Sequence, residues 1–151
     1  MPIKLLSPIY KTFELTRADL KYGNEGETTT VTIKQARQHE HQRRQDLFKR
    51  LERQWNTADD PNDIHLVQEV SMVEVYREEA RMTMVECNIM GPDDKILFTS
   101  RSGKEGHPEL AMSKQQFDEA WGQLFPDIAE EIVEKIHDVN LLWGGPQGEA
   151  V

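Results

Sequence analysis

Cysteine is almost absent from this 151-residue chain, since Cys87 is the single one. A lone thiol cannot form an internal disulfide, which excludes a small disulfide-stapled scaffold. No local signature places a base beside Cys87. We therefore expect Cys87 to be a small buried hydrophobic residue and not a nucleophile.

Long apolar runs are also missing. No stretch of about 18 apolar residues is present, so we expect no membrane span and no membrane partner. The first ten residues, MPIKLLSPIY, lack the apolar core of a secretory signal. Together with the lone thiol, this absence predicts a cytoplasmic protein.

Motifs of catalysis, cofactor binding and metal binding are absent as well. The chain contains no P-loop, GxGxxG, GxSxG, HExxH or CxxC pattern. The best metal candidates are His39 and His41, but residues two apart on a helix point about 200° apart and cannot share one ion. The 27 acidic residues offer many carboxylate pairs, and none stands out by its spacing. We expect no catalytic, cofactor-binding or metal-binding residues, and no enzyme.

Hydrophobic periodicity predicts a mainly α fold with minor β structure, in one domain spanning 1–151. About four helices are expected: over 34–55, over about 71–88 after a capping box at Ser71, after the cap Ser113, and from Pro126 to Val139. Over 82–89 a strand competes with the second helix. The first half of the 34–55 helix is expected to be mostly solvated, because the apolar stripe there meets charged residues, and the second half is expected to dock.

Short β structure and loops are expected between and before these helices. Residues 12–16 predict a short N-terminal strand, and 28–33 predict either a second strand or a lead-in to the first helix. Gly91-Pro92-Asp93-Asp94 is turn chemistry and predicts a hairpin near 85–98. We expect loops at 56–63 and 99–112, the latter mobile, and flexible ends at 1–11 and 144–151.

Charge is unevenly distributed along the chain. The formal net charge is −9, yet 34–55 carries seven basic residues against three acids and 118–139 carries seven acids against one lysine. These two helices are candidates for charge pairing, within a chain or between copies. The residues that would pair are Arg43, Arg44 and Arg50 with Glu130, Glu131 and Glu134. The basic helix also admits contact with nucleic acid, although the acidic remainder would repel a duplex.

Large apolar residues are concentrated near the C-terminal end. Those of the two last helices are expected to be mainly core, whereas 141–143 lies outside the helix and is as well suited to a partner as to the core. The candidate partner-binding residues are Phe117, Trp121, Leu124, Phe125, Ile128, Leu141, Leu142 and Trp143.

This C-terminal pattern has a counterpart in a known family. It reads Phe117-x3-Trp121-x2-Leu124-Phe125-Pro126-x-Ile128-Ala129, followed by Ile132 and Val139-Asn140. Upstream, TVTI at 30–33 leads into a charged helix, and VECNI at 85–89 meets a turn and ILF at 96–98. Over most of residues 12–143 the chain resembles the tail assembly chaperones of long-tailed (siphovirus-type) bacteriophages and prophages. It departs from them where Phe125 interrupts the usual Leu-Pro step and where Leu141 replaces a proline.

The resemblance implies a non-catalytic protein that binds and solubilises the tape measure protein while the tail tube assembles. Its partners would be the tape measure protein, the tail tube protein and further copies of itself, with oligomerisation through 117–143. It would act in the bacterial cytoplasm, bind no nucleic acid and be absent from the finished virion. Two alternatives remain at this point: a structural tail or connector protein of the virion, and a nucleic-acid-binding regulator that uses helix 34–55.

Overall fold

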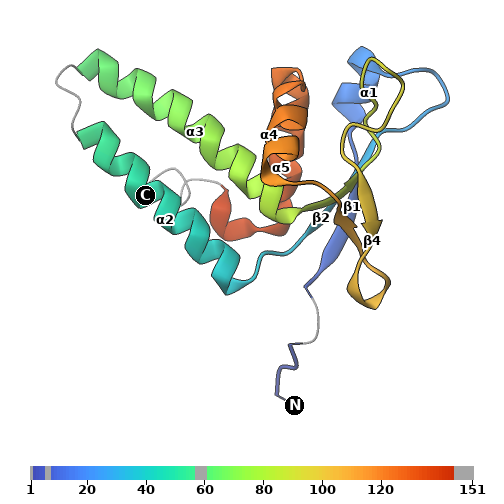
Figure 1. The fold of residues 1–151 in the computed structure, drawn as a ribbon, viewed down its shortest axis with the longest axis horizontal. Helices are drawn as coiled ribbons and strands as arrows, with labels where there is room; N and C mark the ends of the chain where they lie inside the picture. The colour runs from blue at the N-terminus through green and yellow to red at the C-terminus, as the bar shows by residue number, and fades with distance from the viewer. Residues whose placement is uncertain (1, 6–7, 57–60, 145–151) are drawn as a thin grey trace.

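The computed structural model describes residues 2–5, 8–56 and 61–144, and of 55–56 and 61–71 only the backbone. Along the described chain, single strands and helices alternate up to α2, and pairs or runs of one kind follow it (Figure 1). Their order is β1 (Tyr10–Glu14), α1 (Thr16–Tyr22), β2 (Thr30–Lys34), α2 (Gln38–Asn56), α3 (Pro61–Thr83), β3 (Met84–Cys87), β4 (Ser100–Ser102), β5 (Pro108–Leu110), α4 (Lys114–Gly122) and α5 (Pro126–Val139). Two short 3-10 turns, η1 (Lys104–Gly106) and η2 (Leu141–Trp143), complete it.

The expectation of a mainly α fold is wrong, because the described residues contain two antiparallel sheets and the architecture is α+β. One sheet has the order β1-β2-β3 and the other pairs β4 with β5. The first sheet joins Val31 to Cys87, residues far apart in the chain. Strand β2 does alternate polar and apolar residues, with Val31 and Ile33 buried, but a window of five residues does not show which distant strand it pairs with. For this reason two of the three strands are undecided from the sequence alone.

Several element boundaries also differ from the expectation. Ser71 lies inside α3, which begins at Pro61, so Ser71 does not cap a helix. The helix ends at Thr83 and β3 follows it directly, so both alternatives for 82–89 hold in part. Helix α1 was not expected at all, and the loop expected at 56–63 overlaps both α2 and α3, with 57–60 outside the described residues.

The segment 99–112 was expected to be a mobile loop and instead forms the β4–β5 hairpin. Arg101 lies opposite Glu109, and their side chains are 2.8 Å apart. The turn places Glu105 at φ 58° and Gly106 at φ 77°, a left-handed conformation that glycine adopts at no steric cost. The turn expected near 91–94 is confirmed, since the Gly91 N–H donates to the Lys95 carbonyl at 2.8 Å.

The two C-terminal helices are confirmed, with the starts that the sequence indicates. Ser113 caps α4 in a capping box with Gln116. Helix α5 begins at Pro126, and proline fits there because the N–H of the first helical residue would make no hydrogen bond within the helix. The expected flexible end 1–11 overlaps β1, which begins at Tyr10. For the other end, 145–151 lies outside the described residues.

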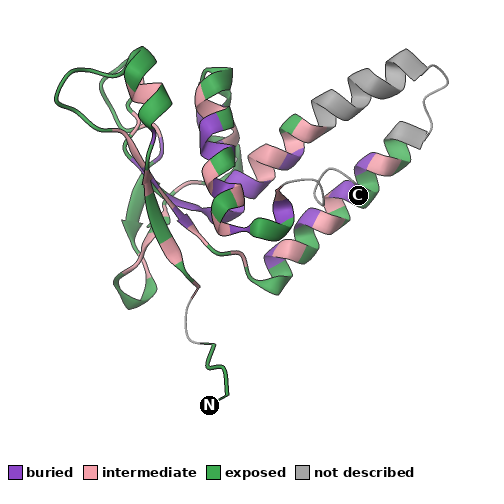
Figure 2. Ribbon diagram, turned by 180° about the vertical axis from the view of Figure 1, so that it is seen from behind, coloured by how far each residue is buried: buried purple, intermediate pink, exposed green. Residues whose placement is uncertain are grey.

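The main core lies where the first sheet meets the ends of α3, α4 and α5 (Figure 2). Its largest fully buried side chains include Leu15, Ile33, Phe98, Phe117, Ile132 and Ile136. Helices α2 and α3 run side by side away from this core and share a second, small cluster of Phe48, Leu51 and Val75. None of the helices in the described part of the chain combines the length and the apolarity needed to cross a membrane.

Candidate functional site

The structure divides the candidate partner-binding residues into buried and exposed ones. Phe117 and Trp121 are 1% and 7% exposed and pack in the core, as expected for the helix stripe. Trp143 is 3% exposed, which decides its open assignment in favour of the core. These three residues therefore offer no surface to a partner of the folded protein. Leu124 and Ile128 are half-buried against the same core.

Three candidates remain exposed, and they lie at opposite ends of α5. Phe125 precedes the helix and stacks on Tyr22, with ring centroids 4.9 Å apart. Leu141 and Leu142 follow the helix and are 75% and 68% exposed. Because a 14-residue helix is roughly 20 Å long, these are two separate apolar surfaces.

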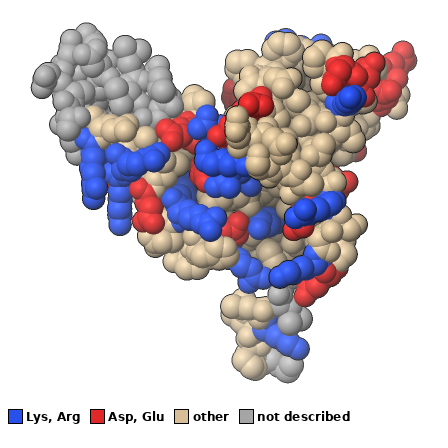
Figure 3. Space-filling model, in the orientation of Figure 1, with Lys and Arg blue, Asp and Glu red and all other residues tan. Residues whose placement is uncertain are grey.

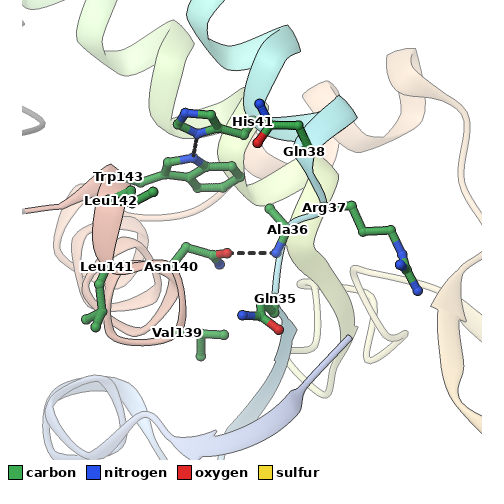
Figure 4. A pocket seen from close by; sticks show the side chains of 10 residues that line it. All are labelled: Gln35, Ala36, Arg37, Gln38, His41, Val139, Asn140, Leu141, Leu142 and Trp143. Carbon is green, nitrogen blue, oxygen red and sulfur yellow. Dashed lines mark hydrogen bonds between the residues drawn. The ribbon is translucent and has the colours of Figure 1, made fainter. Parts of the chain in front are cut away.

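Leu141 and Leu142 form one wall of a groove of about 280 Å³, which we call the η2 groove (Figure 4). The segment 35–38 and His41 line the opposite side, and Val139, Asn140 and Trp143 complete the lining. The groove therefore joins the start of α2 to the end of α5, two parts of the chain about a hundred residues apart. Asn140 and Trp143 point into the body of the protein, whereas Leu141 projects outward from the turn.

Asn140 anchors the start of η2. Its Oδ1 accepts a hydrogen bond from the Ala36 N–H at 2.7 Å, and its Nδ2 donates to the carbonyls of Ile136 at 3.2 Å and Lys34 at 3.4 Å. These bonds tie the end of α5 to the segment that connects β2 to α2. Since Asn140 is 8% exposed, the bonds are shielded from competing water.

Trp143 anchors the other end of η2. Its indole Nε1 donates to His41 Nδ1 at 2.9 Å, and its carbonyl accepts from Arg44 Nη2 at 3.1 Å. The Arg44 guanidinium also lies over the Trp143 ring, 5.6 Å from the centroid. The two exposed leucines are thus held between two fixed, buried residues, so their exposure is built into the fold.

Arg44 belongs to a buried charged network. Its Nε lies 3.1 Å from Oε1 of Glu79, and Oε2 of Glu79 lies 2.8 Å from His137 Nε2. Arg44 is 3% exposed and Glu79 is fully buried. The attraction between the two buried charges offsets the free energy of removing them from water, which either charge alone would leave uncompensated. The network links α2, α3, α5 and, through Trp143, the η2 groove.

The expectation that the first half of α2 is mostly solvated holds for Gln38, His39, Gln42 and Arg43, which are exposed, but it is wrong for two positions of the apolar stripe. Glu40 and Arg44 are both buried, with Glu40 3.3 Å from Lys34 Nζ and its Oε1 accepting from the Arg37 N–H. The apolar stripe of the helix continues through these charged residues, because partners on α3 and β2 satisfy them. The contact between Arg44 and Glu79 had a signal in the sequence, because each of them is a charged residue in line with the apolar residues of its helix.

Among the described residues of the chain, the expected pairing of basic α2 with acidic α5 does not form. Arg44 pairs with Glu79 and Arg50 with Glu74, both on α3. Glu131 is 1% exposed and accepts hydrogen bonds from the N–H groups of Arg17 and Ala18 at the start of α1. Glu134 contacts the Arg17 guanidinium. Arg43 and Glu130 are exposed on different parts of the surface.

Basic side chains gather over α2 in the view of Figure 3. A cleft beside this helix is lined by Arg43, Arg50, Arg77 and Lys114 together with Asp46, Glu74 and Glu78. Arg50 contacts Glu74 at 2.8 Å, and Arg77 contacts Asp118 at 3.4 Å. This mixture of signs leaves little uncompensated positive charge for a phosphate backbone.

Cys87 is buried, as expected, and burial raises the pKa of its thiol to about 11. The thiolate that a nucleophile requires is therefore disfavoured at neutral pH. Among the described residues no three His, Cys, Asp or Glu side chains are grouped so that they could hold a metal ion. His41 instead accepts from Trp143.

Comparison with protein-family models, with curated proteins and with solved structures finds no match to this chain.

Proposed function

We propose that this protein is a non-catalytic tail assembly chaperone of the long-tailed phage type, which binds an apolar helical segment of the tape measure protein in the η2 groove. The observation that carries the proposal is the pair Leu141 and Leu142, held exposed between buried anchors beside an open groove. Large apolar side chains fixed in water in this way mark a surface for another macromolecule.

The shape of the groove favours a protein segment over a small ligand. Its volume of about 280 Å³ is at the lower limit of small-molecule pockets, and it is open to solvent instead of enclosed. An amphipathic helix can place aliphatic side chains at i, i+3 and i+4 into such a groove while it covers the exposed leucines. Gln35 and Gln38 at the rim supply polar contacts for the edges of that helix.

In the proposed role, the protein works in the cytoplasm of the bacterial host. Several copies shield one long tape measure chain from aggregation while the tube polymerises, and they leave before the tail is complete. Mass spectrometry of purified particles separates this role from that of a structural tail or connector protein, because the chaperone is missing from the particle and the structural protein is present. The nucleic-acid alternative is disfavoured, because Arg44 is buried against Glu79 and Arg50 pairs with Glu74.

The direct test is co-expression with the tape measure protein that the proposed role requires in the same genome. Full burial of a leucine contributes about 1.5–3 kcal/mol, so two leucines at 75% and 68% exposure contribute about 3 kcal/mol. The double variant Leu141→Ser with Leu142→Ser should weaken client binding on the order of 100-fold. The matched control is Val73→Ser, which removes an apolar side chain that is 60% exposed on α3, away from the groove.

Co-purification and a gain in soluble client with the wild-type chain and with the Val73 variant, both lost with the double variant, would support the proposal. If the wild-type chain neither solubilises nor retains the client, the proposed function is wrong. If the double variant retains the client as well as the control does, the η2 groove is not the binding surface.

A further inference from the structure

Strand β1 lies at the open edge of the three-stranded sheet. It is bonded to β2 on one side, and the described residues place no strand on the other. Its residues Lys11, Thr12 and Glu14 are exposed. An open edge presents unpaired backbone groups, which can pair with another strand.

The outward-facing groups of β1 follow from its register. The Ile9 carbonyl accepts from the Gln35 N–H at 2.7 Å, and the Leu15 N–H donates to the Thr29 carbonyl at 2.8 Å. In an antiparallel ladder the bonding direction alternates, so the odd residues of β1 bond to β2. The N–H and carbonyl groups of Tyr10, Thr12 and Glu14 therefore face outward.

We propose that β1 pairs antiparallel with β1 of a second copy about a two-fold axis at Thr12, which joins the two sheets into one. This register uses all five residues of the strand and brings the outward groups of the even residues opposite each other. It sets Lys11 opposite Phe13 of the second copy, whereas a two-fold axis at Lys11 would oppose the two lysines. Lys11 does not block the edge, because its Nζ lies over its own Phe13 ring, 5.1 Å from the centroid.

A second observation identifies the occupant as another copy of this chain. The described residues before β1 carry exposed apolar side chains, with Ile3 at 90%, Leu5 at 85% and Ile9 at 62% exposure, and residues 2–5 lie away from the folded body (Figure 1). In the proposed register Ile9 lies opposite Leu15 of the second copy. The preceding residues then pass along α1 of that copy, in whose second half Leu20 is 88% exposed.

Each copy thus provides an apolar arm and an apolar surface that the arm of the other copy can cover. Four extended residues span about 13 Å, enough to reach from Ile9 along a seven-residue helix of about 10 Å. Five paired residues alone bury far less than the roughly 1,200 Å² of a stable interface, so the arms are needed. This inference is independent of client binding at the η2 groove.

Proline at position 12 tests the pairing selectively. Thr12→Pro removes an outward N–H and leaves the bonds to β2 intact, because edge strands tolerate proline on their open side. Thr12→Ala is the matched control, since both variants lose the side-chain bond to Thr32 and only proline loses the N–H. We expect a dimer mass by light scattering at about 100 μM for the wild type and for the alanine variant, and a monomer mass for the proline variant.

Disulfide trapping tests the register directly. At the two-fold axis the Cα atoms of the two Thr12 residues would lie about 5.5 Å apart, a separation that a disulfide spans. Thr12→Cys should therefore oxidise to a covalent dimer, whereas Thr32→Cys, on the central strand, should not. The native Cys87 is buried and adds no background.

A wild-type chain that is monomeric at this concentration would overturn the proposal, and so would a proline variant that is folded by circular dichroism and still dimeric. If the proline variant does not fold, the trapping result decides, and a Thr12→Cys yield no higher than that of Thr32→Cys refutes the pairing. A monomeric wild type whose proline variant loses the client would overturn self-pairing and assign the edge to a client strand.

Discussion

Loss of Arg44 is the perturbation whose cost the structure defines best. Arg44 is 3% exposed, and Arg44→Met would take the guanidinium away from the fully buried Glu79 and leave it the contact with His137 Nε2 at 2.8 Å. Breaking a buried ion pair by removing one side typically costs about 3–5 kcal/mol, because the remaining charge is desolvated and uncompensated. Since small domains are stable by about 5–15 kcal/mol, this single change should remove a large share of the stability.

The double variant Arg44→Met with Glu79→Leu separates the ion pair from simple packing. It removes both charges and retains apolar volume, a change that is often nearly neutral at buried pairs. We therefore expect most of the lost stability to return, although the bond from Arg44 to the Trp143 carbonyl and the contact of His137 with Glu79 stay lost. The assay is equilibrium unfolding in guanidinium, followed by circular dichroism and extrapolated to water.

Two results would refute this reasoning. A cost below about 1 kcal/mol for Arg44→Met would mean that Glu79 does not depend on Arg44, either because it is not a buried anion or because His137 compensates it, since ordinary surface substitutions already reach about half of that. A double variant as unstable as the single one would mean that shape, and not charge, sets the cost at this site.

Two further predictions concern Cys87 and Gly144. Burial raises the Cys87 pKa to about 11, so roughly one thiol in a thousand is ionised at pH 8. A thiol reagent should therefore label the protein only after unfolding. Rapid stoichiometric labelling of the folded protein would contradict the burial of Cys87. A Cβ at Gly144 would lie 2.6 Å from the Cβ of His137, so Gly144→Ala should lower the free energy of unfolding by about 1–3 kcal/mol in the same guanidinium assay. The control is Gly122→Ala at the end of α4, where a Cβ meets nothing within 4 Å and the change should be neutral or stabilising; equal losses at the two positions would disprove the steric account.

Local signals in the sequence predicted the two C-terminal helices well. Ser113 and Pro126 mark the starts of α4 and α5, and the apolar residues at helical spacing lie on their buried faces. Such signals work because capping and helix periodicity act between residues only a few positions apart. The buried state of Cys87 followed in the same way from the absence of a partner base.

The partner-binding candidates show where this local reasoning ends. Phe117, Trp121 and Leu142 are all large and apolar, yet only Leu142 is strongly exposed. Hydrophobicity predicts that a side chain can be buried, but the number of core positions depends on how the elements pack. The sequence therefore identified the segment 117–143 as important without separating its core residues from its surface.

The amino-acid sequence by itself determined where the C-terminal helices begin, where the chain turns at 91–94, and that one thiol would be buried. Only the tertiary structure decided that β1, β2 and β3 form a sheet, that Arg44 and Glu79 meet in the interior, and that Leu141 and Leu142 stay exposed. The physical reason is range. Caps and turns depend on neighbouring residues, whereas strand pairing, buried charge compensation and exposure depend on segments that folding brings together from distant parts of the chain.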